Sequence, residues 1–142
     1  MAITKNWPIH FQIVVGSFKS DSYQAFILEV SEKLPASKHY LIQDNAVIHH
    51  KCTSGNPLHE MVYLPPYSPF INPIECVFSK LKRHIRSKMS MDGIVIESRL
   101  NYVKQMIQEE INSHEYNDLR RYYRHISNFF IDIAQKNDIF GD

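Results

Sequence analysis

The segment from Val62 to Arg86, VYLPPYSPFINPIECVFSKLKRHIR, constrains the fold more than any other part of the chain. Its four prolines lie between positions 65 and 73. Proline lacks a backbone N–H and has a fixed φ, so this stretch can be neither a continuous helix nor an inner strand. Apolar residues at helical spacing follow directly. We therefore predict a rigid loop that connects a short apolar strand to an amphipathic helix opening at Asn72-Pro73-Ile74-Glu75.

The other periodicities predict strands that alternate with helices. An apolar run at 9–15 reads as a strand, and apolar residues spaced three and four apart from Ser20 to Leu34 predict a helix that Pro35 stops. Further strands are predicted at 40–42 and 61–64, a short helical stretch at 46–51, and helices at 95–113 and 116–135. This order favours an α/β layer fold with parallel strands, in which functional groups gather at the carboxyl ends of strands.

Composition restricts the class of protein. The chain has 142 residues, about one domain, and its 44% hydrophobic content is that of a globular protein. No apolar run approaches the length of a membrane span, and the first residues lack the features of a secretory signal. Cys52 and Cys76 show no metal-like pairing, which fits a reduced intracellular protein. We expect an intracellular chain with no membrane partner.

Positive charge is concentrated in one segment. The net charge is +1, yet the stretch from Cys76 to Met91 contains five basic residues and no acid. They are Lys80, Lys82, Arg83, Arg86 and Lys88. Basic charge gathered on one helix suits a polyanion such as DNA. A solvated helix face explains the charge equally well, so both interpretations stay open.

Glu75 also has two interpretations. Asn72 is a favoured N-cap, proline is favoured at the next position, and a glutamate three residues after the cap completes a capping box. However, helical geometry also places Glu75 on one stripe with Ser79, Lys82 and Arg86. Glu75 and Lys82 lie ~10 Å apart along the axis, too far for a direct ion pair. A carboxylate with cations further along could serve a metal ion and approaching phosphates.

A second carboxylate, Asp44, follows the predicted strand at 40–42. Mg²⁺ takes oxygen ligands, commonly one or two carboxylates with waters and substrate phosphates. Two such ions can activate an attacking hydroxyl and stabilise the leaving oxygen of a phosphodiester. Two carboxylates from separate elements could share that work.

The segments LIQDNAVIHH and VYLPPYSPFINPIECVFSKLKRHIR together resemble the catalytic domain of the mariner-type transposases of the DDE superfamily. That family carries a strand-end Asp-Asn-Ala with a histidine just after it. Leu-Pro-Pro-Tyr-Ser-Pro follows, and then Asn-Pro-Ile-Glu opens a helix. Each of these elements is present here in the same order over residues 41–86. Weaker resemblance extends over 16–130, with a C-terminal helical region at 92–135.

The resemblance implies a ribonuclease-H-like α/β fold of three layers, with a mixed sheet and flanking helices. It also implies an acidic triad that binds Mg²⁺ or Mn²⁺ and cuts and joins DNA strands at transposon ends. Asp44 matches the second acid and Glu75 the third, so both are expected to be catalytic metal ligands. His49 matches the family's histidine and receives no role. We expect core or helix-surface positions for His49, His50 and His59, because they have no zinc-ligand spacing with Cys52.

The chain departs from the family at its beginning. The family's first acid lies on the first strand, whereas the first acidic residue here is Asp21, at the start of the first predicted helix. We therefore expect residues 1–142 to form one partial catalytic domain, N-terminally truncated and without the helix-turn-helix region.

Such a partial domain is expected to be inactive alone. Activity would require the missing aspartate from another polypeptide or an upstream reading frame, and the candidate partners are a homodimer or a complementing transposase chain. We expect a nuclear location if the host is eukaryotic. The alternative is a non-catalytic DNA-binding or interaction protein, derived from a transposase, that uses the basic helix at 77–88.

Overall fold

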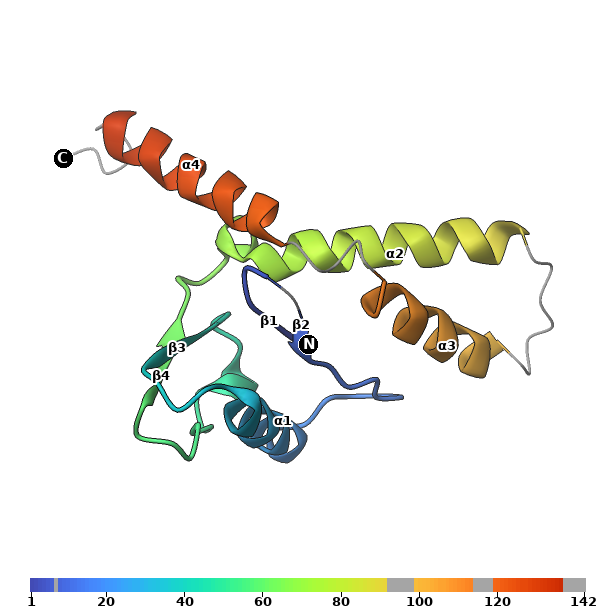
Figure 1. The fold of residues 1–142 in the computed structure, drawn as a ribbon, viewed down its shortest axis with the longest axis horizontal. Helices are drawn as coiled ribbons and strands as arrows, with labels where there is room; N and C mark the ends of the chain where they lie inside the picture. Colours follow the sequence, from blue (N-terminus) through green and yellow to red (C-terminus); the bar gives the residue numbers. More distant parts are fainter. Residues whose placement is uncertain (7, 92–98, 114–118, 137–142) are drawn as a thin grey trace.

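The computed structural model describes residues 1–6, 8–91, 99–113 and 119–136 (Figure 1). The strands are β1 (Ala2–Ile3), β2 (Pro8–His10), β3 (His39–Gln43) and β4 (His59–Tyr63). The α-helices are α1 (Ser20–Lys33), α2 (Pro73–Met91), α3 (Arg99–Ile111) and α4 (Arg120–Lys136), and short 3-10 turns, η1 and η2, cover Val47–His49 and Pro69–Ile71. Among these residues no helix is both long and apolar enough to cross a membrane.

Helix α1 forms as its apolar spacing predicts. Phe26, Ile27 and Val30 are buried, and Leu41 of β3 and Met61 of β4 pack against them. The spacing of three and four puts these side chains on one helix face, so the helix is held by tertiary packing along that face. The residue after the helix adopts an extended conformation immediately before Pro35, which confirms the predicted end.

Strands β3 and β4 form the parallel pair that the sequence predicts. Leu41 lies opposite Met61, and the register continues to Gln43 opposite Tyr63. Asp44 follows the last residue of β3 directly. The expectation that this strand delivers Asp44 at its carboxyl end is therefore confirmed.

The expected three-layer sheet is not found in the described residues. They form two separate two-stranded sheets, antiparallel β1–β2 and parallel β3–β4. The strand predicted at 9–15 ends at His10, and residues 11–15 belong to no strand or helix. The reason is the shortness of β1: it pairs through Ala2 and Ile3 only, so no ladder hydrogen bonds reach residues 11–15.

Within the described residues helix α2 is the longest helix, with α3 alongside its C-terminal half and α4 crossing near its N-terminal end (Figure 1). An ion pair between His84 Nε2 and Glu110 Oε2, 3.1 Å apart, joins α2 to α3. Val77 of α2 and Leu119, just before α4, are both fully buried and in one cluster. The starts predicted for the last two helices, at 95 and 116, lie outside the described residues.

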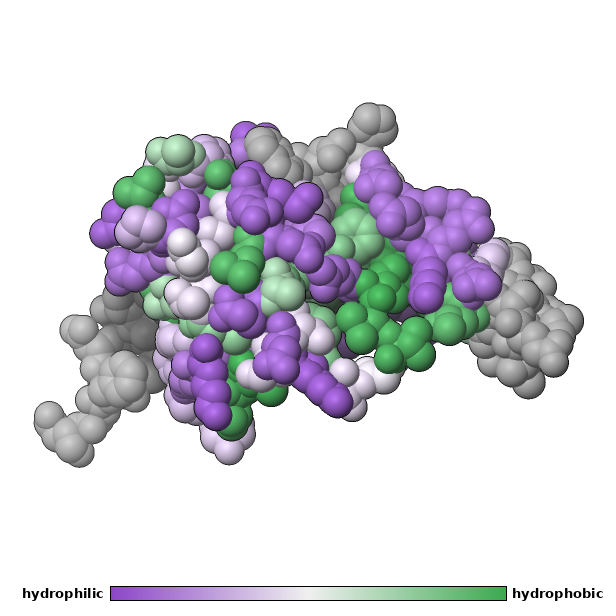
Figure 2. Space-filling view, turned by 90° about the horizontal axis from the view of Figure 1, so that it is seen from below, coloured by the Kyte–Doolittle hydropathy of each residue, from purple (hydrophilic) through white to green (hydrophobic). Residues whose placement is uncertain are grey.

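Figure 2 shows apolar side chains gathered between the region of α1 and helix α3. Here residues 8–11 and Ile13 line a hollow with Lys33 of α1 and with Lys104, Gln108 and Ile111 of α3. The N-terminal segment therefore lies between α1 and α3, two helices that are far apart in the sequence.

Candidate active site

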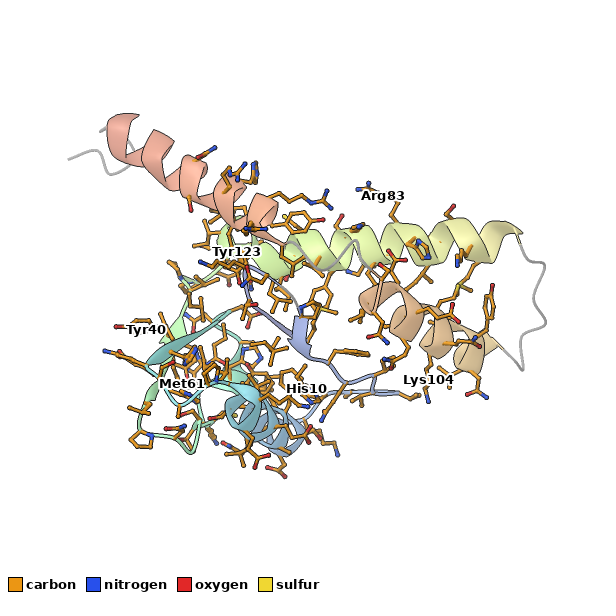
Figure 3. The ribbon with its side chains drawn as sticks, in the orientation of Figure 1. His10, Tyr40, Met61, Arg83, Lys104 and Tyr123 are labelled. Atoms are coloured by element: carbon orange, nitrogen blue, oxygen red, sulfur yellow. The ribbon has the colours of Figure 1, made fainter. Side chains whose placement is uncertain are left out.

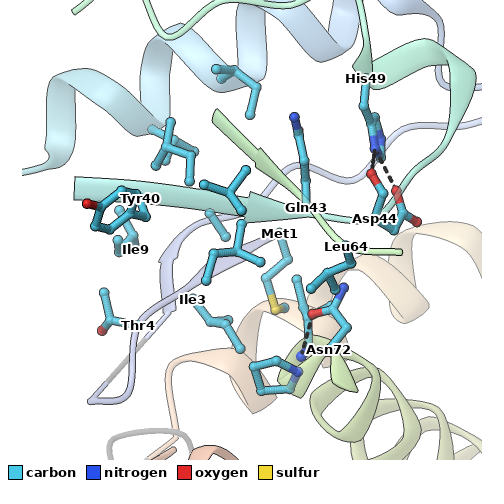
Figure 4. A pocket seen from close by; sticks show the side chains of 18 of the residues that line it. Met1, Ile3, Thr4, Ile9, Tyr40, Gln43, Asp44, His49, Leu64 and Asn72 are labelled. Atoms are coloured by element: carbon cyan, nitrogen blue, oxygen red, sulfur yellow. Dashed lines mark hydrogen bonds and ion pairs between the residues drawn. The ribbon is translucent and has the colours of Figure 1, made fainter. Parts of the chain in front are cut away.

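Asp44 and Glu75 line one cleft of about 750 Å³ (Figure 4). The cleft lies between β3, the N-terminal segment and the first turn of α2. Asp44 enters it from the carboxyl end of β3, and Glu75 from the helix that the proline loop precedes. Two residues with thirty others between them in the sequence are thus brought to one cavity.

The proline loop is fixed at both ends. At its start, the Leu64 backbone N–H donates a hydrogen bond to the Gln43 carbonyl, one residue before Asp44, over 2.8 Å. At its far end Ile71 is buried. Between them Tyr67 has a φ of 57°, a left-handed conformation that a bulky residue seldom adopts. The loop therefore sets where α2 begins relative to β3.

Asn72 caps α2 as predicted, but the capping box with Glu75 does not form. Its side-chain oxygen accepts a hydrogen bond from the Ile74 N–H at 3.2 Å. Its own N–H donates instead to the Pro69 carbonyl at 3.1 Å, so Glu75 is not needed as the reciprocal acceptor. Glu75 is exposed, and its carboxylate makes no hydrogen bond or ion pair with any residue that the structure describes. That carboxylate is left available to a ligand.

We expect Asn72→Ala to lower the free energy of unfolding by about 1 kcal/mol, because the Ile74 N–H loses its acceptor. Urea denaturation measures this change. Asn72→Asp keeps an acceptor at the same place and should stay within about 0.5 kcal/mol of the parent. Equal losses in the two variants would show that the side-chain cap does not stabilise α2.

His49 holds the Asp44 carboxylate in place. Its Nδ1 lies 2.6 Å from Asp44 Oδ1 and 3.2 Å from the Asp44 carbonyl oxygen (Figure 4). Both partners are acceptors, so Nδ1 carries the proton. The imidazole stacks on Tyr23 with ring centroids 4.0 Å apart, and the Tyr63 hydroxyl donates to the His49 carbonyl. The His49 ring, which is held by these contacts, therefore orients the Asp44 carboxylate.

Sequence reasoning assigned no role to His49. Its spacing is the signal that could have identified it, because His49 is the fifth residue after Asp44. A single 3-10 turn, η1, reverses the chain after Asp44 and brings the His49 ring to the carboxylate. His59, by contrast, is a buried core residue as predicted, with Nδ1 2.6 Å from Ser31 Oγ. His50 stacks on Tyr63 at the surface of the same turn.

Tyr23 is held in its neutral form beneath this site. Burial raises the pKa of its hydroxyl above the ordinary value, and the negative charge of Asp44 raises that pKa further. The protonated hydroxyl donates to Gln43 Oε1. Because Gln43 itself is buried, its hydrogen bond with Tyr23 fixes the end of β3, which Asp44 follows directly.

The donor set suits a hard divalent cation. Asp44 and Glu75 each offer carboxylate oxygens, the kind of ligand that Mg²⁺ or Mn²⁺ takes from proteins, commonly one or two at a site. Within the described residues, no group of three His, Cys, Asp or Glu side chains is arranged to hold a metal ion. Asp44 and Glu75 are the two acids among the described residues that line the cleft.

The basic segment of α2 is mostly exposed. Lys82, Arg83, Arg86 and Lys88 are exposed, whereas Lys80 is half-buried. Figure 3 shows Arg83 on the side of α2 that faces away from the strands. Glu75, Ser79, Lys82 and Arg86 are all exposed, as the predicted stripe requires.

Paired carboxylates from separate elements that face one cleft are a ligand set suited to metal-dependent phosphodiester chemistry. Comparison with protein families agrees: residues 1–94 match the model described as DDE superfamily endonuclease. The match covers about two-thirds of the chain, so the chain belongs to the DDE superfamily endonuclease family. Searches of curated proteins and of solved structures gave no significant match. Family membership indicates a transposase-type nuclease that acts on DNA and uses a divalent metal.

Proposed function

We propose that this chain is part of the catalytic domain of a mariner-type transposase, which cleaves and joins DNA strands with Mg²⁺ or Mn²⁺. One observation carries the proposal: Asp44 and Glu75 line the same cleft in a chain of the DDE superfamily. The motif order over residues 41–86 supports the mariner type.

In this proposal Asp44 and Glu75 hold the metal. A bound divalent cation would activate the attacking hydroxyl and stabilise the leaving oxygen of the phosphodiester. His49 fixes the direction of the Asp44 carboxylate through its Nδ1–H, and the stacked Tyr23 ring fixes His49. Lys82, which shares the exposed stripe with Glu75, would meet the DNA phosphates.

The acid that matches the family's first position is not among residues 1–142, and it would be supplied by another polypeptide or by an upstream reading frame. Two carboxylates bind a metal ion more weakly than three, because each missing ligand removes charge and geometry from the site. We therefore propose that residues 1–142 act as a partial domain with little activity alone.

Nicking of supercoiled plasmid DNA with Mn²⁺ tests the catalytic proposal. Metal-dependent nicking by the parent chain that is lost in both Asp44→Ala and Glu75→Ala would support it. Glu32→Ala, at an exposed glutamate of α1, is the matched control and should nick as the parent does. Equal background nicking in every variant would remove the enzymatic interpretation for this chain.

The second candidate is non-catalytic DNA binding through the exposed basic residues of α2. The double variant Lys82→Glu, Arg86→Glu should bind duplex DNA at least about tenfold more weakly in 50 mM salt, and its salt slope should be smaller by about two. Fluorescence anisotropy at 50 and 200 mM salt measures both. Lys19→Glu, Lys33→Glu makes the same charge change on α1 and should have little effect. If the α2 variant binds DNA as the parent does, the basic residues of α2 form only a solvated helix face and do not bind DNA.

A further inference from the structure

The proline loop that joins β4 to α2 lies at the rim of the cleft (Figure 1). Leu64 and Ile71, at the two ends of the loop, line the cleft, whereas residues 65–70 between them do not. Those six residues are exposed, except that Ser68 is half-buried. The middle of the loop therefore projects into solvent beside the cleft that Asp44 and Glu75 share.

Tyr67 occupies the middle of this loop in a backbone conformation that does not suit a tyrosine. Its φ is 57°, and it directly follows Pro66 in a turn. A positive φ after a proline in a turn is normally adopted by glycine or asparagine, because a bulky side chain is strained there. The local energetics of the backbone therefore do not explain why a tyrosine stands at this position.

The Tyr67 side chain does not stabilise the core either. It is 99% exposed, the highest fraction of any large apolar side chain among the described residues. Its ring neither stacks on nor hydrogen-bonds to any residue that the structure describes. Strained backbone that persists beside a functional site is commonly part of that site. Since neither folding energetics nor packing explains the ring, we assign it to contact with a ligand.

The chemistry of the loop suits a nucleobase and not a phosphate. Residues 61–74 contain no charged side chain, so the loop offers nothing that would neutralise a phosphate. An exposed ring in a loop that prolines stiffen presents a flat face at little entropic cost, and every base can stack on such a face. In a duplex, neighbouring pairs cover the faces of each base. Only an unpaired base can therefore stack on Tyr67.

We propose that the Tyr67 ring stacks on an unpaired DNA base next to the phosphodiester that enters the cleft. The inference rests on the proposed function, because it concerns the strand whose phosphate meets Asp44 and Glu75. The loop leads directly into the helix that carries Glu75, so a strand that leaves the two carboxylates on this side passes along the loop. The stack holds one base out of its pair. The chain should therefore bind an overhanging or frayed DNA end more tightly than a blunt one.

Binding of a duplex with a short single-stranded overhang tests the stacking. The overhang carries 2-aminopurine, a fluorescent base whose emission falls when it stacks, and fluorescence anisotropy gives the affinity. The assay contains EDTA and uses the Asp44→Asn, Glu75→Gln chain, so neither metal nor the charge of the two acids affects the result. In this background Tyr67→Ala should weaken binding at least about tenfold and abolish the quenching. Tyr67→Phe keeps the ring and should bind within about twofold of its parent.

Three controls separate stacking from folding and from phosphate contact. Tyr67→Gly removes both the ring and the strain, so it should be at least as stable in urea as Tyr67→Ala and bind the overhang as weakly. An abasic overhang keeps every phosphate, and Tyr67→Ala should change its binding by no more than about twofold. Val47→Ala shortens a side chain that is 83% exposed near Asp44 and is not aromatic, and it should bind as its parent does.

Several outcomes would overturn the stacking. Equal losses for the base-bearing and abasic overhangs would assign the effect to phosphates, and a loss in Tyr67→Phe as large as in Tyr67→Ala would assign it to the hydroxyl. Unchanged DNA binding in Tyr67→Ala and Tyr67→Gly would leave the ring to a protein partner. Because the assay contains no metal, failure of the metal-dependent nicking experiment does not affect this result. A negative result here equally leaves the nicking experiment intact.

Discussion

The Asp44→Asn variant is expected to lose Mn²⁺ binding in the cleft, with an affinity at least about tenfold below that of the parent. Asparagine removes the negative charge but keeps a side-chain oxygen. That oxygen can still accept from His49 Nδ1 and from the Ala46 N–H, as Asp44 does. The local fold should therefore persist, and the loss would report on charge at the proposed metal site.

Paramagnetic broadening of backbone amide signals during a Mn²⁺ titration measures this effect. Residues beside Asp44 and Glu75 should broaden first in the parent chain, and Glu75→Gln should reduce the broadening as Asp44→Asn does. Glu32→Gln removes one charge from an exposed position of α1 and should titrate as the parent. Unchanged broadening around the cleft in both site variants would refute the assignment of these two carboxylates as ligands.

The Leu119→Ala variant is expected to lose about 2–5 kcal/mol of unfolding free energy. Leu119 is 0% exposed and packs against Val77 of α2, with Tyr122 and Tyr123 around them. Removing its side chain leaves a cavity between α2 and α4 that rigid neighbours fill poorly. Such a loss is a large part of the total stability of a small domain.

Urea denaturation followed by circular dichroism measures the loss. Leu100→Ala makes the same substitution at a position that is 48% exposed, and it should change the unfolding free energy by no more than about 0.5 kcal/mol. Similar effects at the two leucines would mean that α4 does not pack on α2 in solution.

Local patterns predicted most of the elements and both candidate acids. The limits of α1 follow from apolar spacing and Pro35, and the cap of α2 follows from Asn72. Placing Asp44 at a strand end needed only the short run before it. These features depend on residues within a few positions of one another, so a single sequence contains the information.

The sheet and the environment of the acids depend on residues far apart in the chain. Residues 11–15 have strand-like composition but no ladder partner in the described fold, so strand propensity was a poor guide there. The capping box with Glu75 does not form, because the Asn72 N–H donates to the Pro69 carbonyl and the Asn72 side chain accepts from the Ile74 N–H. His49 was missed because its role exists only when a 3-10 turn folds it over Asp44.

The sequence by itself determined a strand that ends in Asp44, a rigid proline loop, and a capped helix whose first turn carries Glu75. Only the tertiary structure decided that the two acids share one cleft and that His49 orients one of them. The physical reason is the sequence separation between the residues that decide each feature. Capping and periodicity are satisfied within a few residues, whereas a cleft depends on which distant segments pair and which do not.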